Sequence, residues 1–518
     1  MFASSLNLPS LRFPRDPRTW PAGSEIRRHL GQEVLWCVYD SKNKNRNGRH
    51  LEVSTLEPYR LVGDEPVDEL FRLLETEERP VRAGDDLLQI AADAYSRQQK
   101  QQGVPNTQSD ASSSSSTLSP ADTALAAFYQ QYSRVPTWVD WETVRAGQQV
   151  FLAYLPAIGY SLYYRSLVPG FSIPKIAAVL LQTAYLAPPS TEERVHQRLM
   201  DTGAFLAVCC CTATATHDDN ETETAALRPT GDAWEAALHV RFLHAKVRRA
   251  LLKRTTGKKA WKTAEWGVPI NQEDLAATLL AFCTNSLLGV EFIVGRAVSE
   301  KERRDYTHFW RYVGWLLGVE TQDEVDHDSN RQQYLRPLDP CGPGWIGKQP
   351  NSIAHSNAMF QSIIYHILHP DESSVRISHF LLRMGRRTDL ERKIVPAESK
   401  VRKTELNPIF YFRALQCRRF VGDPLADALE LPHHPVWYHR VWHRIKSNLV
   451  MLVLRLYSIA AMPWSPFRQR IIRYHGNNMD RFVQYWRDSH TNTMTVELEK
   501  QGVMGRACPF AMVAPPHD

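Results

Sequence analysis

Apolar residues recur three and four positions apart through most of the chain from Ala121 onward. This spacing places them on one face of an α-helix, whereas a half-buried strand would alternate apolar and polar positions. Strand-like alternation between tight turns is scarce in this part of the chain. The pattern therefore predicts an all-α fold, built as a large helical bundle.

Capping signals mark several helix starts in this region. They are the capping boxes Ser190 with Glu193 and Ser299 with Glu302, and the cap Asn271 flanked by Ile270 and Leu275 as a hydrophobic staple. The first predicts a helix reaching roughly Cys209. The second predicts a helix that stops near Gly318, since glycine tolerates the left-handed conformation that ends many helices.

One composition shift divides the chain. Residues 96–120 are rich in Gln and Ser and too polar to bury enough surface to order themselves. We therefore predict an N-terminal arm over 1–95, a disordered linker over 96–120, a main helical domain over 121–400 and a C-terminal helical extension over 401–518 that packs on it. The arm has a helical pattern but no residues that suggest chemistry.

The helix predicted over Ala233–Arg254 carries a histidine within its apolar stripe. The stripe consists of Val240, Leu243, Val247 and Leu251, and His244 falls among them. A buried histidine is most simply a core residue bonded to a carbonyl. The alternative is a metal or haem ligand, whose second ring nitrogen is held by a nearby acceptor.

Two arginines flank His244 on the same side of this helix. Arg241 lies three residues before it and Arg248 four residues after it. Guanidinium groups in these places suit carboxylates such as haem propionates. The alternative is that both belong to a solvated basic face, which the neighbouring lysines and arginines also form.

A second polar anomaly lies on the helix that follows Ser190. Arg198 and Thr202 are four residues apart and fall on or beside its apolar stripe. A buried arginine needs a strong acceptor, because an unpaired buried charge is costly. The acceptor is either a carboxylate elsewhere in the fold, or the pair faces a cofactor from the side opposite His244 and polarises bound oxygen or a substrate group.

Composition narrows the function classes. Lys and Arg (62) exceed Asp and Glu (56) by only six, which is too thin a surplus for a nucleic-acid binder. Nucleotide-binding and hydrolase motifs are missing from the sequence. The eight cysteines include no CxxC pair, and this usage favours a reduced, intracellular compartment. The 52 aromatic residues suit a deep apolar cavity or a membrane-facing surface.

One apolar stretch comes close to the length of a membrane span. Residues 448–464 are mostly apolar but carry Arg455 in the middle, a costly group at bilayer depth. We expect a buried or interfacial helix rather than a span. Peripheral membrane contact remains open.

Several segments together resemble a known oxygenase family. HVRFLHAKVR and GVPINQEDLAATLL are the most specific, and TWVDWETVRAGQQVFL and RLMDTGAFL precede them in the family's order. The chain resembles, from roughly Thr137 to about Asp389, the latex-clearing rubber oxygenases and the fungal ER-bound prenyl-chain-cleaving oxygenases.

The resemblance implies a globin-reminiscent helical core around a buried pocket that holds a b-type haem. His244 would then be the iron ligand, Arg241 and Arg248 would contact the cofactor, and Arg198 and Thr202 would be the catalytic pair near the oxygen site. Two positions depart from the rubber oxygenases. Asp201 stands where they have a lysine, and Gln182 stands where we align their acidic base.

These departures favour the fungal branch of the family, whose members act on small prenylated or polyketide intermediates. We therefore expect a haem-dependent oxygenase of secondary metabolism. Its substrates would be O2 and a small lipophilic molecule of prenylated, terpenoid or polyketide type, and its reaction C=C cleavage or oxygenation. No nucleic-acid partner is expected. The expected location is cytoplasmic or peripheral on the endoplasmic reticulum membrane, and the oligomeric state is open.

Two alternatives remain at the level of sequence. One is a non-haem iron oxygenase on the same helical frame, with His244 and other His or carboxylate ligands. The other is a non-catalytic helical protein that binds lipids or a membrane.

Overall fold

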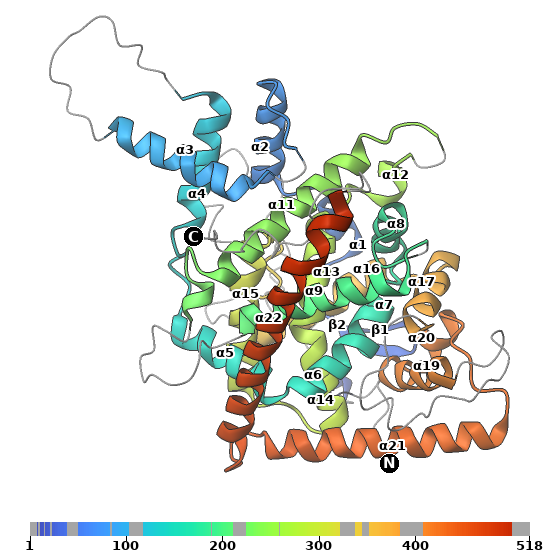
Figure 1. Ribbon diagram of the computed structural model, residues 1–518. Coiled ribbons are helices and arrows are strands. Elements are labelled where there is room, and N and C mark those ends of the chain that lie inside the picture. Colours follow the sequence, from blue (N-terminus) through green and yellow to red (C-terminus); the bar gives the residue numbers. More distant parts are fainter. Residues whose placement is uncertain are drawn as a thin grey trace, which may run out of the picture.

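The computed structural model describes most of the 518-residue chain. The described residues are 8–102, apart from 9–10, 15, 21–22, 39–49 and 83–84; 118–210, apart from 188; 224–321, apart from 258–259; 337–343; 352–383; and 408–499. Helices dominate this part of the chain (Figure 1). The all-α prediction is confirmed, with one small sheet as the exception.

That sheet is an N-terminal hairpin of β1 (Glu25–His29) and β2 (Gln32–Trp36). The strands are antiparallel, and His29 pairs with Gln32 across a two-residue loop. Leu30 and Gly31 both have positive φ (44° and 77°). This conformation matches the loop to the twist of the strands.

The rest of the N-terminal region is helical and packs onto the body. Its elements are α1 (Val53–Leu56), the 3-10 turn η3 (Glu57–Leu61), α2 (Glu65–Thr76) and α3 (Leu87–Gln102), after a short 3-10 turn η2 (Pro17–Thr19). Helix α2 packs against α11 and α4, and α1 packs against α16. The arm is thus part of the same hydrophobic core as the body.

The body and C-terminal part contain the remaining helices. They are α4 (Pro120–Tyr132), α5 (Trp141–Ala153), α6 (Leu155–Ser161), the π-helical segment η4 (Leu162–Leu167), α7 (Val168–Gly170), α8 (Pro174–Thr183), α9 (Glu192–Cys210), η5 (Ala225–Leu227), α11 (Asp232–Leu252), α12 (Thr263–Trp266), α13 (Gln272–Phe282), α14 (Thr284–Val294), α15 (Glu300–Leu316), α16 (Ser352–Ile367), α17 (Glu372–Arg383), α19 (Pro408–Val421), α20 (Asp423–Ala428), α21 (Trp437–Ala460) and α22 (Arg468–Glu499).

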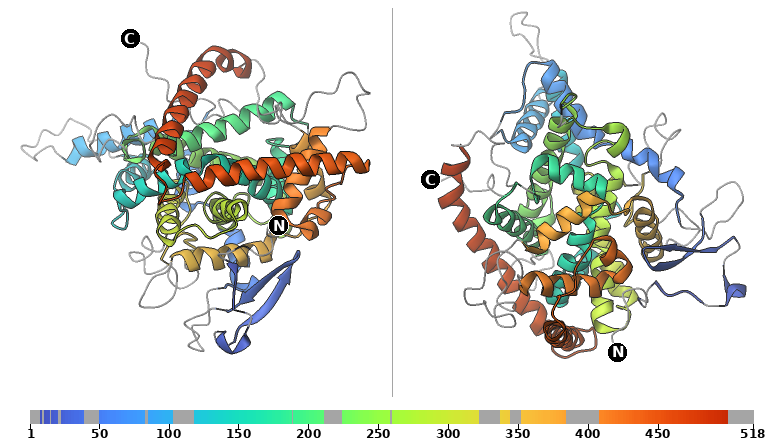
Figure 2. Two further views of the ribbon diagram at one scale, coloured as in Figure 1. Left: turned by 90° about the horizontal axis from the view of Figure 1, so that it is seen from below. Right: turned by 90° about the vertical axis from the view of Figure 1, so that its right-hand side faces the viewer.

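The helices form layers around buried segments. Helix α5 packs along α15, and α22 crosses the outside of α9 and α5 (Figure 1). Helix α14 is buried at every position, between α6, α16 and α21. Helix α21 lies along one edge of the body, and the view from below shows it stretched across the surface (Figure 2).

Two of the predicted helix starts are confirmed. Asn271 Oδ1 accepts a hydrogen bond from the Asp274 backbone N–H at 2.9 Å. The Ser299 hydroxyl accepts from the Glu302 N–H at 3.3 Å, which confirms the cap, and donates to the Glu302 carboxylate at 2.7 Å. The stop at Gly318 is also confirmed, because this residue has a φ of 93°.

The predicted cap at Ser190 is wrong by one residue. The Thr191 hydroxyl accepts from the Arg194 N–H at 3.3 Å, whereas the Ser190 hydroxyl donates to the Ala184 carbonyl. Both side chains suit a cap, and the preceding turn uses the first of them. Helix α9 consequently begins at Glu192.

The domain boundaries stay a prediction, although two features bear on them. Helix α3 continues through Gln102, so residues 96–102 are helical where the linker was expected. Residues 103–117 lie outside the described part of the chain.

The six described cysteines are all buried, and they form no disulfide among themselves.

Membrane-length helices are few in the described residues. The continuous helical stretch from α13 to α14 is long and apolar enough to span a membrane, but 83% of it is buried inside the protein. A pair of segments, Leu155–Gly170 and Pro174–Thr183, passes the same test only if a 91° bend is ignored. Of residues 448–464, those up to Ala460 belong to α21, which lies on the surface with one face buried.

Candidate functional site

Helix α11 carries the candidate site, and its burial differs from the prediction. Of the expected apolar stripe, only Leu251 is fully buried, and Val240, Leu243 and Val247 keep accessible surface. His244 lies on this partly accessible strip. The stripe prediction was wrong because small and aromatic residues on another face, such as Ala237 and Phe242, pack into the core instead.

His244 is held as a neutral imidazole. Burial, followed by the positive charge of Arg248, lowers the pKa of its ring to about 4. Its Nδ1 atom is buried and has no hydrogen-bond partner among the described residues. The acceptor expected for a ligand histidine is therefore not found in the described part of the chain. A buried, neutral ring with an unsatisfied nitrogen can serve as a Lewis base.

Arg241 is fully engaged in a buried ion pair. Its Nε and Nη2 atoms donate to the Asp64 carboxylate at 2.6 and 2.8 Å, and both side chains are almost completely buried. The guanidinium also lies 4.3 Å from the centre of the Tyr132 ring. This fork-like pairing neutralises the charge of Arg241, and among the described residues it leaves only Nη1 without a partner.

Arg248, one turn beyond His244, has a different environment. It is 1% exposed, yet none of its three guanidinium nitrogens has a hydrogen-bond partner among the described residues. Its nearest anion is Asp68, at 3.3 Å without hydrogen-bond geometry. Burial raises the pKa of Asp68 to about 6 and the charge of Arg248 lowers it, so this carboxyl is still mostly ionised at pH 7 although it accepts no hydrogen bond from the guanidinium. The expectation that Arg248 could belong to a solvated basic face is wrong, because α2 covers it.

A second buried cation lies beside this group. Arg60, in η3, is 3% exposed, and its Nε and Nη2 atoms have no partner among the described residues. It is electrostatically coupled to Asp274 at the start of α13. Burial and the neighbouring Glu273 raise the pKa of Asp274 to about 7. A negative charge on Asp274 also favours the protonated form of Arg248, because it acts to raise the pKa of that guanidinium.

A buried chain of ionisable groups extends from this point. His366 on α16 bridges two carboxylates, with Nδ1 2.6 Å from Glu273 and Nε2 2.8 Å from Glu57. The second carboxylate oxygen of Glu273 is buried without a partner among the described residues. His366 thereby links three helical segments that are far apart in sequence, η3, α13 and α16, through hydrogen bonds between ionisable side chains.

The N-terminal arm was predicted to contain no residues that suggest chemistry, but it contributes buried charges beside the candidate site. It supplies Asp64 and Asp68, which pair with arginines of α11, and Arg60, which interacts electrostatically with Asp274 at the start of α13. Their spacing resembles that of an ordinary helix start, so nothing local marks them. The acidic pair in the segment GVPINQEDLAATLL was the one available signal, because Glu273 and Asp274 open a strongly apolar helix.

Arg198 and Thr202 are placed together on α9, as predicted, but their polar atoms are engaged locally. Arg198 Nη1 donates to the Ala184 carbonyl at 2.8 Å and to the Tyr185 carbonyl, and its guanidinium lies 4.2 Å from the centre of the Tyr185 ring. The Thr202 hydroxyl donates to the Arg198 carbonyl at 3.0 Å. The strong acceptor required by Arg198 is thus the carbonyl end of α8.

The two departures from the rubber oxygenases have structural roles. Asp201 accepts hydrogen bonds from Gln197 at 2.8 Å and from the Trp486 indole at 3.1 Å, so it joins α9 to α22. The Gln182 carbonyl accepts from Arg254 at 3.0 Å. Asp201 therefore connects two helices through its side chain, whereas Gln182 connects the end of α8 to the segment after α11 mainly through its backbone.

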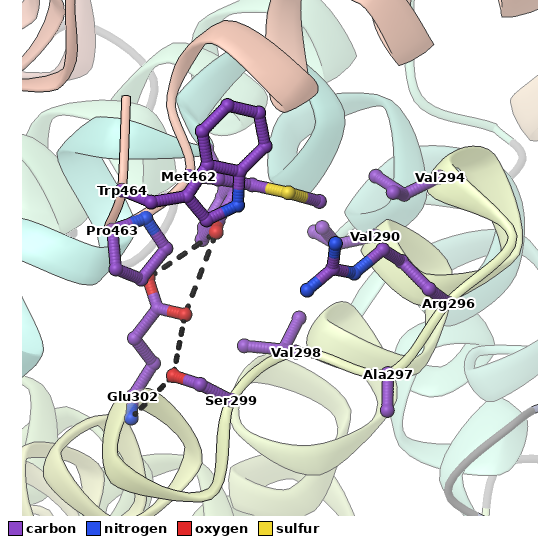
Figure 3. A pocket seen from close by; sticks show the side chains of 11 residues that line it. Val290, Val294, Arg296, Ala297, Val298, Ser299, Glu302, Met462, Pro463 and Trp464 are labelled. Atoms are coloured by element: carbon purple, nitrogen blue, oxygen red, sulfur yellow. Dashed lines mark hydrogen bonds between the residues drawn. The ribbon is translucent and has the colours of Figure 1, made fainter. Parts of the chain in front are cut away.

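The structure contains few alternatives to this site. No group of three or more His, Cys, Asp or Glu side chains among the described residues is arranged to hold a metal ion. A cavity of about 190 Å³ lies between the end of α14, the start of α15 and the turn after α21 (Figure 3). It contains none of the predicted site residues and is smaller than the ~300–1,000 Å³ typical of ligand pockets.

Comparison with known proteins supplies the family. The model of the catalytic domain of the ER-bound oxygenases mpaB/B′ and the rubber oxygenases matches residues 168–456, more than half of the chain. The chain belongs to this family. The match includes all five predicted site residues, and the protein is therefore an O2-dependent oxidoreductase.

A solved structure of the latex clearing protein LCP in the closed state is also similar. It is 16% identical, the match covers 82% of this chain and 91% of that chain, and the TM-score is 0.46. No curated protein matches the chain. The resemblance stated from sequence segments is thus confirmed by the family model, and the oxygenase assignment follows from it.

Proposed function

We propose that this oxygenase is haem-dependent and that it acts on a lipophilic substrate. One observation supports the proposal above the others. A neutral imidazole with a buried Nδ1, His244, and a buried guanidinium without hydrogen-bond partners among the described residues, Arg248, lie four residues apart on α11. The first can bind iron, and the second needs an anion.

The residues present fit a b-type haem. His244 would hold the iron, because a single protein histidine is enough for haem, whereas a non-haem centre needs several ligands. Arg248 and Arg60 would each pair with a carboxylate, which would satisfy nitrogens that have no partner among the described residues. Arg241 would be a positioning residue, because its two hydrogen bonds to Asp64 hold α11 against the N-terminal region.

When bound, haem supplies the iron at which O2 is activated. The chain itself contributes the surroundings. Burial keeps His244 unprotonated at neutral pH, so its lone pair is available. Arg198 and Thr202 would be the polar pair of the reaction. Arg198 uses Nη1 for both carbonyls, and a guanidinium carries further N–H groups that can donate elsewhere.

The proposed substrate is a small prenylated, terpenoid or polyketide molecule, and the reaction is cleavage or oxygenation of a carbon–carbon double bond. Membership of the oxygenase family supports the reaction class. The many aromatic residues support an apolar substrate. A non-haem iron centre at His244 would need further ligands outside the described residues, because the described ones form no such group.

An absorption spectrum of the purified protein tests the proposal. We expect a Soret band that is lost in His244→Ala. The matched control is His239→Ala on the same helix, whose Nε2 already has Asp86 as a partner at 3.1 Å. This control should keep the band. Folded protein that contains iron but no porphyrin would instead support the non-haem alternative, and folded wild-type protein with neither would contradict both.

A further inference from the structure

The outward face of α21 is apolar over its whole length. Its exposed large residues are Trp437, Tyr438, Val441, Trp442, Ile445, Leu449, Leu452, Val453 and Leu456. They recur three and four positions apart, so they form one stripe on a helix about 36 Å long. Trp437 is 68% exposed, and Trp464 and Phe467 extend the stripe beyond the end of the helix.

The opposite face of α21 is already used. His443, Ser447, Val450, Met451, Leu454 and Ser458 are buried, and the helix packs on α14, α19 and α6. The helix is therefore fixed to the body along its length, lying flat on the surface (Figure 2). Because one face is packed on the body, α21 exposes its apolar stripe on the protein surface and does not itself span a bilayer.

Charge distinguishes this surface from an ordinary hydrophobic interface. Residues 431–479 contain no Asp or Glu and seven Lys or Arg, which is more than the net charge of +6 of the entire chain. On the helix, Arg444 and Arg455 lie along one edge of the stripe and Lys446 along the other, by helical geometry. Two copies of such a surface would repel each other, whereas an anionic lipid surface would attract it.

The end of the stripe meets the small cavity described above. Trp464 is 65% exposed and lines that cavity together with Val294, Val298 and Met462 (Figure 3). Arg296 lies on the same rim and is exposed. An apolar recess with a cation at its rim continues the same combination of properties that α21 presents.

We propose that α21, with Trp464 and Phe467, is a membrane-docking surface that lies in the plane of an anionic lipid bilayer. The apolar stripe enters the headgroup–acyl boundary, and the flanking cations contact anionic headgroups. The tryptophans and the tyrosine of this surface suit the headgroup–acyl boundary, because these two residue types are enriched at membrane–water interfaces. This surface is independent of the proposed cofactor, because its residues lie outside the His244 site.

Flotation of the full-length protein with vesicles tests the apolar stripe. We expect binding to phosphatidylcholine vesicles that contain phosphatidylserine, and at least about tenfold weaker binding of Ile445→Glu/Leu449→Glu, since each substitution removes an exposed apolar side chain that would enter the bilayer. Tyr485→Glu, at an equally exposed aromatic position on α22, is the matched control and should bind as the wild type does.

A second pair of variants tests the charge. Arg440→Glu/Arg444→Glu should weaken binding about tenfold or more and remove its dependence on phosphatidylserine and on salt. Arg97→Glu/Lys100→Glu on α3, at the far end of the molecule, is the control (Figure 1). The proposal is overturned if the wild-type protein binds vesicles neither with nor without phosphatidylserine. It is also overturned if the α21 variants bind as strongly as the wild type. A wild-type dimer in sedimentation velocity that these variants dissociate would assign the stripe to a second copy.

Discussion

The surroundings of α11 and the outer face of α21 are opposites in polarity. Inside the protein, α11 carries arginines and a histidine at positions where a core helix normally has apolar residues. Outside, α21 carries tryptophan, isoleucine and leucine where a surface helix normally has charges. Buried charges and exposed apolar patches are the two departures from ordinary burial that most often mark function.

The comparison also separates two kinds of buried charge. Arg241 and Arg248 are on one helix and equally hidden, but Arg241 has a complete carboxylate partner and Arg248 does not. A satisfied pair belongs to the folded structure, and removing one partner leaves the other exposed to a low dielectric. Arg248 lacks hydrogen bonds of this kind among the described residues, and this difference supports the proposal that an anion binds beside it.

The largest expected effect is that of Arg241→Met on stability. We expect the free energy of unfolding of the cofactor-free protein to fall by about 3–5 kcal/mol, because Asp64 would be left buried without a partner. Urea unfolding measures this. Arg249→Met, which removes a partly exposed pair with Glu75, should change the value by only about 0–1 kcal/mol. Equal losses in the two variants would show that the buried pair is not special.

Substitutions on the two faces of α21 should differ by a similar amount in their effect on the free energy of unfolding. Met451→Ala should lower the free energy of unfolding by about 2–5 kcal/mol, because Met451 is completely buried. Leu452→Ala, one residue along and exposed, should change it by less than about 0.5 kcal/mol. Thermal unfolding of both proteins gives the comparison. A large loss in Leu452→Ala would mean that the outer face is covered by another part of the protein.

Arg248→Met should separate stability from cofactor binding. The cofactor-free protein should lose much less stability than Arg241→Met does, because Arg248 donates no hydrogen bond to a described residue and because loss of its charge lets the pKa of Asp68 rise further, toward the neutral form. Haem affinity should fall about 10–100-fold, since charge-assisted hydrogen bonds contribute about 1.5–3 kcal/mol each. Haem titration and urea unfolding measure the two quantities. If the stability falls as in Arg241→Met, Arg248 is a structural residue.

The smallest expected effect is a pH dependence at Asp274. Its pKa is raised from 3.8 to about 7 by burial, so the folded state holds a proton that the unfolded state releases above about pH 4. Stability from this group is therefore lost as the pH rises from about 4 to about 7. The difference in Tm between Asp274→Asn and wild type should increase in favour of the variant across that interval. The exposed Asp93→Asn should show a constant difference, and the same constancy in Asp274→Asn would contradict the prediction.

Much of the local structure could be predicted from the sequence. The caps at Asn271 and Ser299 and the stop at Gly318 depend on residues within one turn of each other, so the sequence contains all that determines them. The cap at Thr191 was missed by one residue because two adjacent side chains compete for the same role. The order of the motifs was enough to indicate the family.

The candidate site could be predicted only in part. His244, Arg241 and Arg248 were identified from their spacing on one helix, and their roles as cofactor-binding residues remain a prediction. The different states of the two arginines could not be predicted, because Asp64 and Asp68 lie about 180 positions earlier in the chain. Arg60 and Asp274 were missed for the same reason, since their charges meet only after folding.

The sequence by itself determined which segments are helices, where several of them end and which family the protein belongs to. Tertiary structure decided which charges are paired, because pairing depends on segments that are distant in the chain. It also decided which face of α21 is covered. Composition shows that residues 431–479 are apolar and basic. Only the packing of α14, α19 and α6 against one side shows that the other side, with its tryptophans, faces outward.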